Sequence, residues 1–109
     1  MNSGVLLVNK ESGISSAKLT RKIQEKFAVK KMGHGGTLDP FATGLLVLLL
    51  DEGTKVSRFL LRGDKTYEAE ALIGAETDTG DLEGKIKVQA APVSLSAWED
   101  CKKQFVELI

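Results

Sequence analysis

A fifteen-residue stretch, residues 30–44, contains four glycines and a proline. Its residues follow neither the period of a helix nor that of a strand, so the stretch predicts a shaped loop. Apolar runs at residues 5–8 and 45–50 each predict a buried strand, and the second run follows the loop directly. The chain is therefore expected to fold around a long loop that two buried strands hold in place.

Helices are predicted on both sides of the loop. Apolar residues at helical spacing predict a helix over about residues 16–28, which Ser15 or Ser16 can cap. Its lysines follow a different stripe from its apolar residues. Thr54 can cap a second, short helix, which ends at Gly63. The residues expected to face inward are Leu19, Ile23 and Phe27 in the first helix and Val56, Phe59 and Leu60 in the second.

The second half of the chain predicts two strands and a final helix. Side chains of residues 65–74 alternate between an apolar face and a more polar face, which predicts a strand with one face more exposed to solvent. Acidic residues 76–84 predict a loop, and residues 85–89 predict another short strand. Ser96 and Glu99 form a capping box for the last helix. The residues expected to face inward in that helix are Trp98, Cys101, Phe105 and Leu108.

Composition excludes several classes of protein. With 109 residues, 42% hydrophobic and 28% charged, the chain fits one globular domain and not a disordered or collagen-like chain. No apolar run approaches the ~20 residues of a membrane-spanning helix, and no signal peptide is recognisable. The single cysteine, Cys101, excludes an internal disulfide and a cysteine zinc cluster, which fits a cytoplasmic protein.

Charge is unevenly distributed, although the net charge is zero. Residues 1–62 carry 10 basic and 5 acidic side chains, and residues 63–109 carry 5 and 10. Seven of the basic residues lie within residues 10–31. Such a surface attracts phosphate, but a solvated helix face has the same composition. Charge alone leaves both interpretations open.

The loop contains the residues best suited to chemistry, His34 and Asp39. Glycines around His34 permit positive φ angles and a close approach of the backbone to a ligand. Asp39 precedes Pro40, which favours an extended conformation, and its carboxylate can act as a nucleophile, act as a general base or cap a turn. A hydrolase that uses Asp39 and His34 is a further alternative.

Three other kinds of site fit the loop less well. A phosphate-binding P-loop needs a Gly-Lys-Ser/Thr ending, which is absent. A zinc site needs more ligands than His34 and Asp39. A catalytic triad of Ser15 or Ser16 with these two residues is conceivable, but the serines lack a nucleophile-elbow pattern.

Residues 33–46, GHGGTLDPFATGLL, resemble the catalytic segment of the TruB-type tRNA pseudouridine-55 synthase family. Residues 9–16 are similar to the family's N-terminal lysine-glycine-serine motif, with Glu11 in place of the usual proline and Asn9 where aspartate is common. Residues 65–67 and 71–81 resemble its tyrosine strand and acidic loop. The matches run in the family's order from residue 4 to about residue 88.

The resemblance implies an enzyme that isomerises uridine 55 in the T-loop of tRNA to pseudouridine. By similarity, Asp39 is the catalytic aspartate and attacks either the sugar or the base. Tyr67 stacks on the flipped uracil, His34 lies where the flipped nucleotide leaves its stack, and Lys10 braces the site or contacts the RNA backbone. Gly36 and Thr37 belong to the substrate-binding loop. The resemblance implies no metal and no organic cofactor, the tRNA T-stem-loop as partner, and no membrane association.

The family also implies a fold and a domain organisation. The fold is α/β in the broad sense (α+β), with a mixed, largely antiparallel sheet flanked by helices, pseudouridine synthase-like but incomplete. Family members are more than twice as long, so residues 1–109 are expected to be the N-terminal portion of a catalytic domain, without its C-terminal half and RNA-binding domain. Unpaired strand edges then favour self-association. The alternative is an inactive RNA-binding or association module derived from the same fold.

Overall fold

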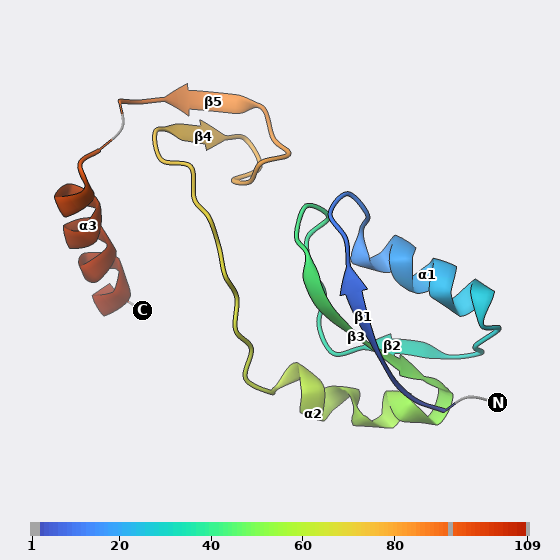
Figure 1. Cartoon of the computed structure of the whole chain (residues 1–109). Coiled ribbons are helices and arrows are strands. Elements are labelled where there is room, and N and C mark those ends of the chain that lie inside the picture. Colours follow the sequence, from blue (N-terminus) through green and yellow to red (C-terminus); the bar gives the residue numbers. More distant parts are fainter. Residues whose placement is uncertain (1–2, 92, 109) are drawn as a thin grey trace. The chain divides into compact units, whose positions relative to one another are not determined.

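The computed structural model describes residues 3–91 and 93–108 and has mixed α and β structure, as predicted. The chain divides into two compact units, Met1–Thr66 (the first unit) and Tyr67–Ile109 (the second unit). In chain order, the elements are β1 (Gly4–Lys10), α1 (Ser16–Lys26), β2 (Met32–His34), β3 (Gly44–Leu50), the 3-10 helix η1 (Asp51–Val56), α2 (Ser57–Leu61), β4 (Ala75–Thr77), β5 (Ile86–Gln89) and α3 (Leu95–Leu108) (Figure 1).

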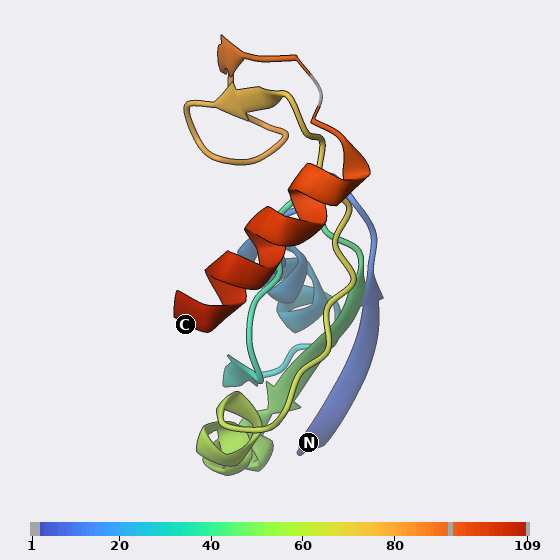
Figure 2. The ribbon, with the colours of Figure 1, turned by 90° about the vertical axis from the view of Figure 1, so that its left-hand side faces the viewer.

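The first unit is built on a three-stranded antiparallel sheet in the order β1-β3-β2. β1 and β3 run side by side along their whole length (Figure 2). The strands predicted at residues 5–8 and 45–50 are thus confirmed, but they are not buried on both faces. The exposed fractions are 53% for Val5, 66% for Leu7 and 63% for Leu45. The buried apolar core consists of Val29, Leu46, Leu48 and Leu49.

Helix α1 begins as predicted and ends earlier than predicted. Ser15 is its N-cap, and its side chain accepts a hydrogen bond from the Lys18 amide at 3.1 Å. The chain then leaves the helix because Ala28 adopts a left-handed conformation (φ 51°). Val29 N–H donates to the carbonyl of Gln24 at 3.1 Å, which completes a Schellman-type ending. The buried Val29 side chain anchors this ending in the core.

The loop predicted over residues 30–44 contains a strand, so that prediction is wrong for β2. Its partner is β3, with Met32 opposite Leu50 and His34 opposite Leu48. Asp51 fixes the start of this pairing: its N–H donates to the Lys31 carbonyl at 2.8 Å, and its carboxylate accepts from the Lys31 N–H at 3.0 Å. A three-residue strand is too short to show a period, so the sequence contains no local sign of it.

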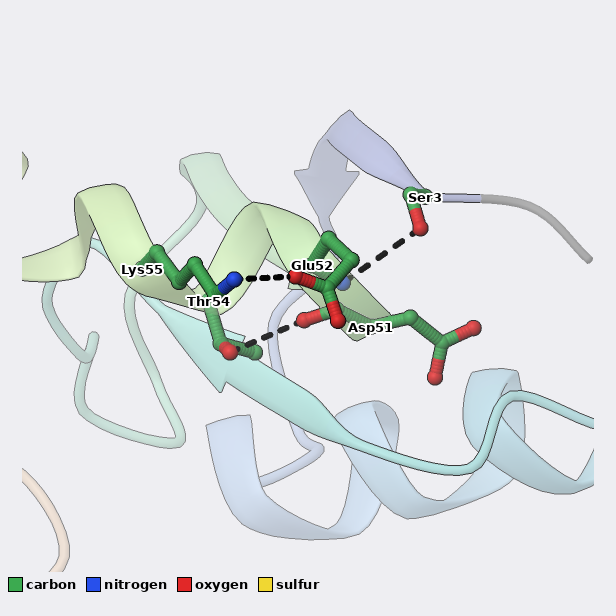
Figure 3. A network of polar contacts seen from close by, with 5 residues as sticks. All are labelled: Ser3, Asp51, Glu52, Thr54 and Lys55. Carbon is green, nitrogen blue, oxygen red and sulfur yellow. Dashed lines mark hydrogen bonds and ion pairs between the residues drawn. The ribbon is translucent and has the colours of Figure 1, made fainter.

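The helical segment after β3 starts as a 3-10 turn, in which Thr54 has a different role from the predicted cap. Thr54 Oγ1 donates to the Asp51 carbonyl at 2.8 Å, and the Glu52 N–H donates to Ser3 Oγ at 3.4 Å (Figure 3). An exposed ion pair with Lys55 lowers the pKa of Glu52 and raises that of Lys55. The predicted inward positions are also wrong for Val56 and Phe59, whose exposed fractions are 41% and 63%.

The strand predicted at residues 65–74 is absent: the chain has no regular structure from 64 to 72. Alternation makes a strand only where a neighbouring strand supplies hydrogen-bond partners. In the second unit β4 pairs with β5 instead, with Ala75 opposite Gln89. The strand predicted at residues 85–89 is confirmed as β5, whereas the predicted acidic loop begins later, because β4 occupies its first residues.

The loop between β4 and β5 is organised by Asp81. Its Oδ1 accepts hydrogen bonds from the Thr79 hydroxyl at 2.7 Å and from the Glu83 N–H at 2.9 Å. Both bonds stabilise the carboxylate, and together they lower the pKa of Asp81, the hydroxyl having the larger effect. The loop is therefore ordered by its own acidic side chain.

Helix α3 begins one residue after Ser94, which caps it in place of the predicted Ser96. Ser94 Oγ accepts a hydrogen bond from the Ala97 N–H at 3.2 Å. The predicted inward face is wrong, since Cys101 is exposed and the exposed fractions of Trp98 and Phe105 are 37% and 65%. The predicted inward Leu108 side chain lies outside the described residues. No helix in residues 3–91 or 93–108 has the length and apolar character to span a membrane.

Candidate functional site

Asp39 lies in the loop between β2 and β3, and the residue before it is firmly anchored. The Leu38 N–H donates to Ser16 Oγ at 2.9 Å, and the same hydroxyl donates to the Leu38 carbonyl at 2.7 Å. Ser16 is the first residue of α1 and is only 5% exposed. The loop is thus attached to the start of α1 immediately before Asp39.

The residue after Asp39 is anchored as well. The Pro40 carbonyl accepts hydrogen bonds from the Gly13 N–H at 2.8 Å and from Lys10 Nζ at 3.0 Å. Lys10 is the last residue of β1, and Gly13 lies between β1 and α1. The backbone on either side of Asp39 is therefore held by the same seven-residue segment, residues 10–16.

Lys10 is buried although it carries an ammonium group: its exposed fraction is 1%. Besides the Pro40 carbonyl, Nζ donates to the Glu11 carbonyl at 2.9 Å and to the Ile14 carbonyl at 2.8 Å. All three hydrogens of the ammonium group thus have an acceptor. These contacts match a bracing role and leave the ammonium no free donor for RNA.

The Asp39 carboxylate itself is exposed, and within the described residues it has no hydrogen-bond partner. Its main-chain carbonyl accepts from the Ala42 N–H at 3.0 Å, which closes a turn over Pro40. The turn is therefore closed by the backbone and not by the side chain. This leaves both carboxylate oxygens accessible to a ligand.

His34 and Gly36 form the beginning of the same loop. His34 Nδ1 accepts a hydrogen bond from the Gly36 N–H at 3.1 Å. A neutral ring therefore carries its proton on Nε2, so Nε2–H remains available as a donor. Gly36 has φ 129°, a conformation that residues with a side chain rarely adopt. The exposed Thr37 follows.

A groove of about 300 Å³ opens between α1 and the loop. His34 and Thr37 line it, and Arg21 contributes a guanidinium group from α1. These three side chains can donate hydrogen bonds, whereas most of the groove lining is apolar. The complete lining is Ser16, Ala17, Thr20, Arg21, Gln24, Met32, His34, Thr37 and Leu46.

The exposed face of α1 is basic, as its lysine stripe predicted. Lys18, Lys22 and Lys26 are all exposed. In the described part of the chain the ion pairs are Glu52–Lys55 and Glu99–Lys102, so the α1 lysines form none. The one acidic residue of α1, Glu25, is exposed as well and forms no ion pair with them.

The catalytic triad considered from the sequence does not form. Ser15 Oγ accepts from the Lys18 N–H, and Ser16 Oγ is bonded to Leu38 in both directions. His34 Nδ1 is bonded to Gly36 and not to Asp39. Nor do three His, Cys, Asp or Glu side chains gather as metal ligands anywhere in the described ranges.

Of the six predicted site residues, five belong to the first unit and surround the loop: Lys10, His34, Gly36, Thr37 and Asp39. Tyr67 belongs to the second unit and is 68% exposed. Its ring is free to stack on a ligand, although the strand expected to carry it is absent.

Sequence reasoning did not predict the contacts of two residues near the loop, Ser16 and Lys65. Ser16 was identified as a helix cap, as a triad member and as part of the motif at residues 9–16, but its bonds to Leu38, 22 positions away, were not predicted. Lys65 Nζ donates to three carbonyls at the end of α2, those of Leu60, Leu61 and Gly63, and its side chain lies beside Gly36. No local pattern signals contacts of this kind, although Lys65 lies in one of the matched motifs.

Comparison with known proteins relates the chain to one family. The family model described as TruB family pseudouridylate synthase (N terminal domain) matches residues 24–109. The tRNA pseudouridine synthase B of Psychrobacter arcticus is 45% identical over 103 residues, which cover 90% of this chain and 26% of that relative. The tRNA pseudouridine synthase B of Blochmanniella pennsylvanica is 42% identical over 106 residues, covering 95% of this chain and 40% of the relative. The chain thus spans between about a quarter and two fifths of the length of these two relatives.

A solved structure is similar as well. It is an H/ACA RNP bound to a substrate RNA containing 2'-deoxyuridine, and it matches with a TM-score of 0.52 and 38% sequence identity. The match covers 53% of this chain and 18% of that chain. Sequence and fold therefore point to the same group of proteins.

Proposed function

Because this chain belongs to the TruB family of pseudouridylate synthases, we propose that it serves the conversion of uridine 55 to pseudouridine in the T-loop of tRNA. The observation that carries the proposal is the exposed Asp39 carboxylate on a backbone anchored at both neighbouring residues. A nucleophile reacts fastest when it is accessible and already oriented. We propose Asp39 as that nucleophile.

The reaction is an isomerisation, so atoms and electrons balance without a co-reactant. The bond between the ribose C1′ and uracil N1 breaks, and a bond between C1′ and uracil C5 forms. C5 loses its proton and N1 gains one. A carboxylate can attack the nucleoside and be released again, which is why the proposal includes neither a metal nor an organic cofactor.

The target base has to leave its stack before Asp39 can reach it, at a cost of a few kcal/mol. We propose that Tyr67 stacks on the extruded uracil, which returns about 1–3 kcal/mol. His34 would occupy the space that the base leaves, where its free Nε2–H can donate to RNA. Gly36 and Thr37 would contact the same nucleotide through the backbone and the hydroxyl.

The basic groups around the loop would hold the RNA. Lys18, Lys22 and Lys26 are exposed and form no ion pair in the described part of the chain, and Arg21 lines the groove beside His34. Phosphate contacts fix the register of an RNA without reading its sequence. We propose that this surface contacts the backbone of the T-stem-loop.

The decisive assay measures tritium released to water from a T-stem-loop RNA labelled at uracil C5. Release is expected from the wild type and not from Asp39→Asn, which keeps the size of the side chain and removes the nucleophile. Asp100→Asn, an exposed aspartate on α3, is the matched control and should retain release. Equal release from Asp39→Asn and the wild type would exclude Asp39 as nucleophile.

A second candidate is an RNA-binding or association module without catalysis. The observation that favours it is the apolar sheet face formed by Val5, Leu7 and Leu45, which is more than half exposed at each residue. Analytical ultracentrifugation tests self-association, and RNA binding without tritium release would support the module. A hydrolase would instead yield free uracil.

Two further parts of the proposal concern the domain to which this chain belongs and the compartment in which it acts. The family model that matches residues 24–109 describes an N-terminal domain, which supports assigning this chain to the N-terminal portion of a catalytic domain. We propose that it acts in the cytoplasm, where a free exposed thiol such as that of Cys101 remains reduced.

A further inference from the structure

The Ser16 hydroxyl contacts one residue twice. It donates to the Leu38 carbonyl at 2.7 Å and accepts from the Leu38 N–H at 2.9 Å. Ser16 is 5% exposed, so water competes little for these bonds. Both polar groups of the Leu38 backbone are therefore satisfied by a single side chain.

These two bonds bear directly on Asp39. A peptide unit is planar, and the Leu38 carbonyl shares its plane with the Asp39 N–H. Fixing that carbonyl therefore fixes the plane from which the Asp39 side chain projects. On the other side the Pro40 carbonyl is held by Lys10 and Gly13. Asp39 thus has a restrained backbone and an unrestrained carboxylate.

The Ser16 end of this link is rigid as well. Ser16 opens α1, and its own carbonyl accepts a hydrogen bond from Thr20 Oγ1 at 2.7 Å. Capping of the helix is left to Ser15, whose hydroxyl accepts from the Lys18 N–H. Two adjacent serines therefore have separate roles, since one starts the helix and the other holds the loop.

We propose that Ser16 is a positioning residue for Asp39: its hydroxyl fixes the Leu38 backbone, so that the Asp39 backbone and the direction of its Cα–Cβ bond are set before substrate binds. The proposal rests on the proposed function of Asp39 as nucleophile. A displacement of about 1 Å in such a group can reduce a rate roughly 100-fold, so loss of the hydroxyl is expected to act on kcat.

The first test concerns the contact alone and needs no substrate. In Ser16→Ala, the Leu38 amide should exchange its hydrogen at least about tenfold faster than in the wild type, as measured by NMR, because an open N–H exchanges freely. Ser16→Thr keeps the hydroxyl, and its added methyl group can enter the groove that Ser16 lines. Protection of Leu38 should return in this variant.

The second test measures kcat and KM for tritium release from the labelled T-stem-loop. Ser16→Ala should lower kcat by roughly 10- to 100-fold with KM within about twofold, and Ser16→Thr should restore most of the loss. Ser15→Ala is the matched control: it removes the neighbouring hydroxyl and lowers the melting temperature through α1, but it should keep both Leu38 protection and kcat.

The outcomes separate this inference from the function on which it rests. If tritium release is lost in Asp39→Asn but unchanged in Ser16→Ala, the positioning role is overturned and the nucleophile stands. If the wild type releases no tritium, or Asp39→Asn releases as much, the proposed function fails, and with it the role of Ser16 in catalysis. Equal losses in Ser15→Ala and Ser16→Ala would reduce Ser16 to a general contribution to stability.

Discussion

Replacing Lys10 by methionine removes one ammonium group and keeps an apolar side chain of similar length. The wild-type group is buried and donates to three main-chain carbonyls at 2.8–3.0 Å. After Lys10→Met the Pro40 carbonyl still accepts from Gly13. The carbonyls of Glu11 and Ile14 lose the side-chain donor that joins them to the loop.

The expected loss of stability follows from these two carbonyls. A buried polar group left without a partner costs about 1–3 kcal/mol, so two of them would cost at most about 2–6 kcal/mol. The actual cost is lower, because Glu11 is exposed and Ile14 only half-buried. Removing the ammonium group also removes the free-energy cost of burying its charge. The carbonyl oxygens of Glu11 and Ile14, which lose their donor, can in part be hydrated by water instead. We therefore expect the free energy of unfolding to fall by about 2–4 kcal/mol, a large part of the ~5–15 kcal/mol typical of a domain.

Urea unfolding followed by circular dichroism measures this change. With a slope of about 2 kcal/mol per molar urea, the middle of the usual range, the midpoint should fall by roughly 1–2 M. Lys22→Met, an exposed lysine on α1, is the control and should change stability by less than about 0.5 kcal/mol. If the two variants unfold at the same urea concentration, the three carbonyl contacts do not stabilise the fold and the reasoning is refuted.

Three further predictions concern other parts of the molecule. Gly53→Ala should cost about 1–3 kcal/mol in urea unfolding, because its Cβ would collide with the Gly4 carbonyl, whereas Gly63→Ala meets only a tight contact with a carbonyl and should cost less. Since the folded-state pKa of Asp81 is depressed, its contribution to stability is present at neutral pH and is lost as the pH falls below about 4. Thr79→Val removes the hydroxyl that donates to Asp81 and should raise the pKa of Asp81 in an NMR titration. An unchanged titration midpoint would contradict this role of Thr79. Changing Lys18, Lys22 and Lys26 together to glutamine should reduce the slope of log binding constant against log salt concentration by about 2, with RNA binding measured by fluorescence anisotropy. The same change at Lys85, Lys87 and Lys103 is the control and should leave this slope nearly unchanged.

The sequence predicted those elements that have a local signature. Apolar runs located β1 and β3, helical spacing and Ser15 located the start of α1, and a short β-branched run located β5. It predicted β2 wrongly as loop, because three residues carry no period. It wrongly predicted a strand at residues 65–74, because alternating side chains indicate a preference for a sheet but do not provide the neighbouring strand that a sheet needs.

The candidate site divides in the same way. The composition of the loop was enough to single out His34 and Asp39, and the motifs in their order were enough to identify the family. The sequence could not show that Lys10 is buried under three carbonyls, or that Ser16 and not Ser15 holds Leu38. The serines are adjacent and chemically identical, so only their surroundings distinguish them.

The amino-acid sequence by itself therefore determined which residues we propose for the chemistry, because residue type and order along the chain are its direct content. The tertiary structure alone decided how Asp39 is held, because the bonds to Leu38 and Pro40 join positions 22 and 30 residues apart. Contacts over such separations depend on how the strands and α1 pack, and packing is a property of the whole folded unit.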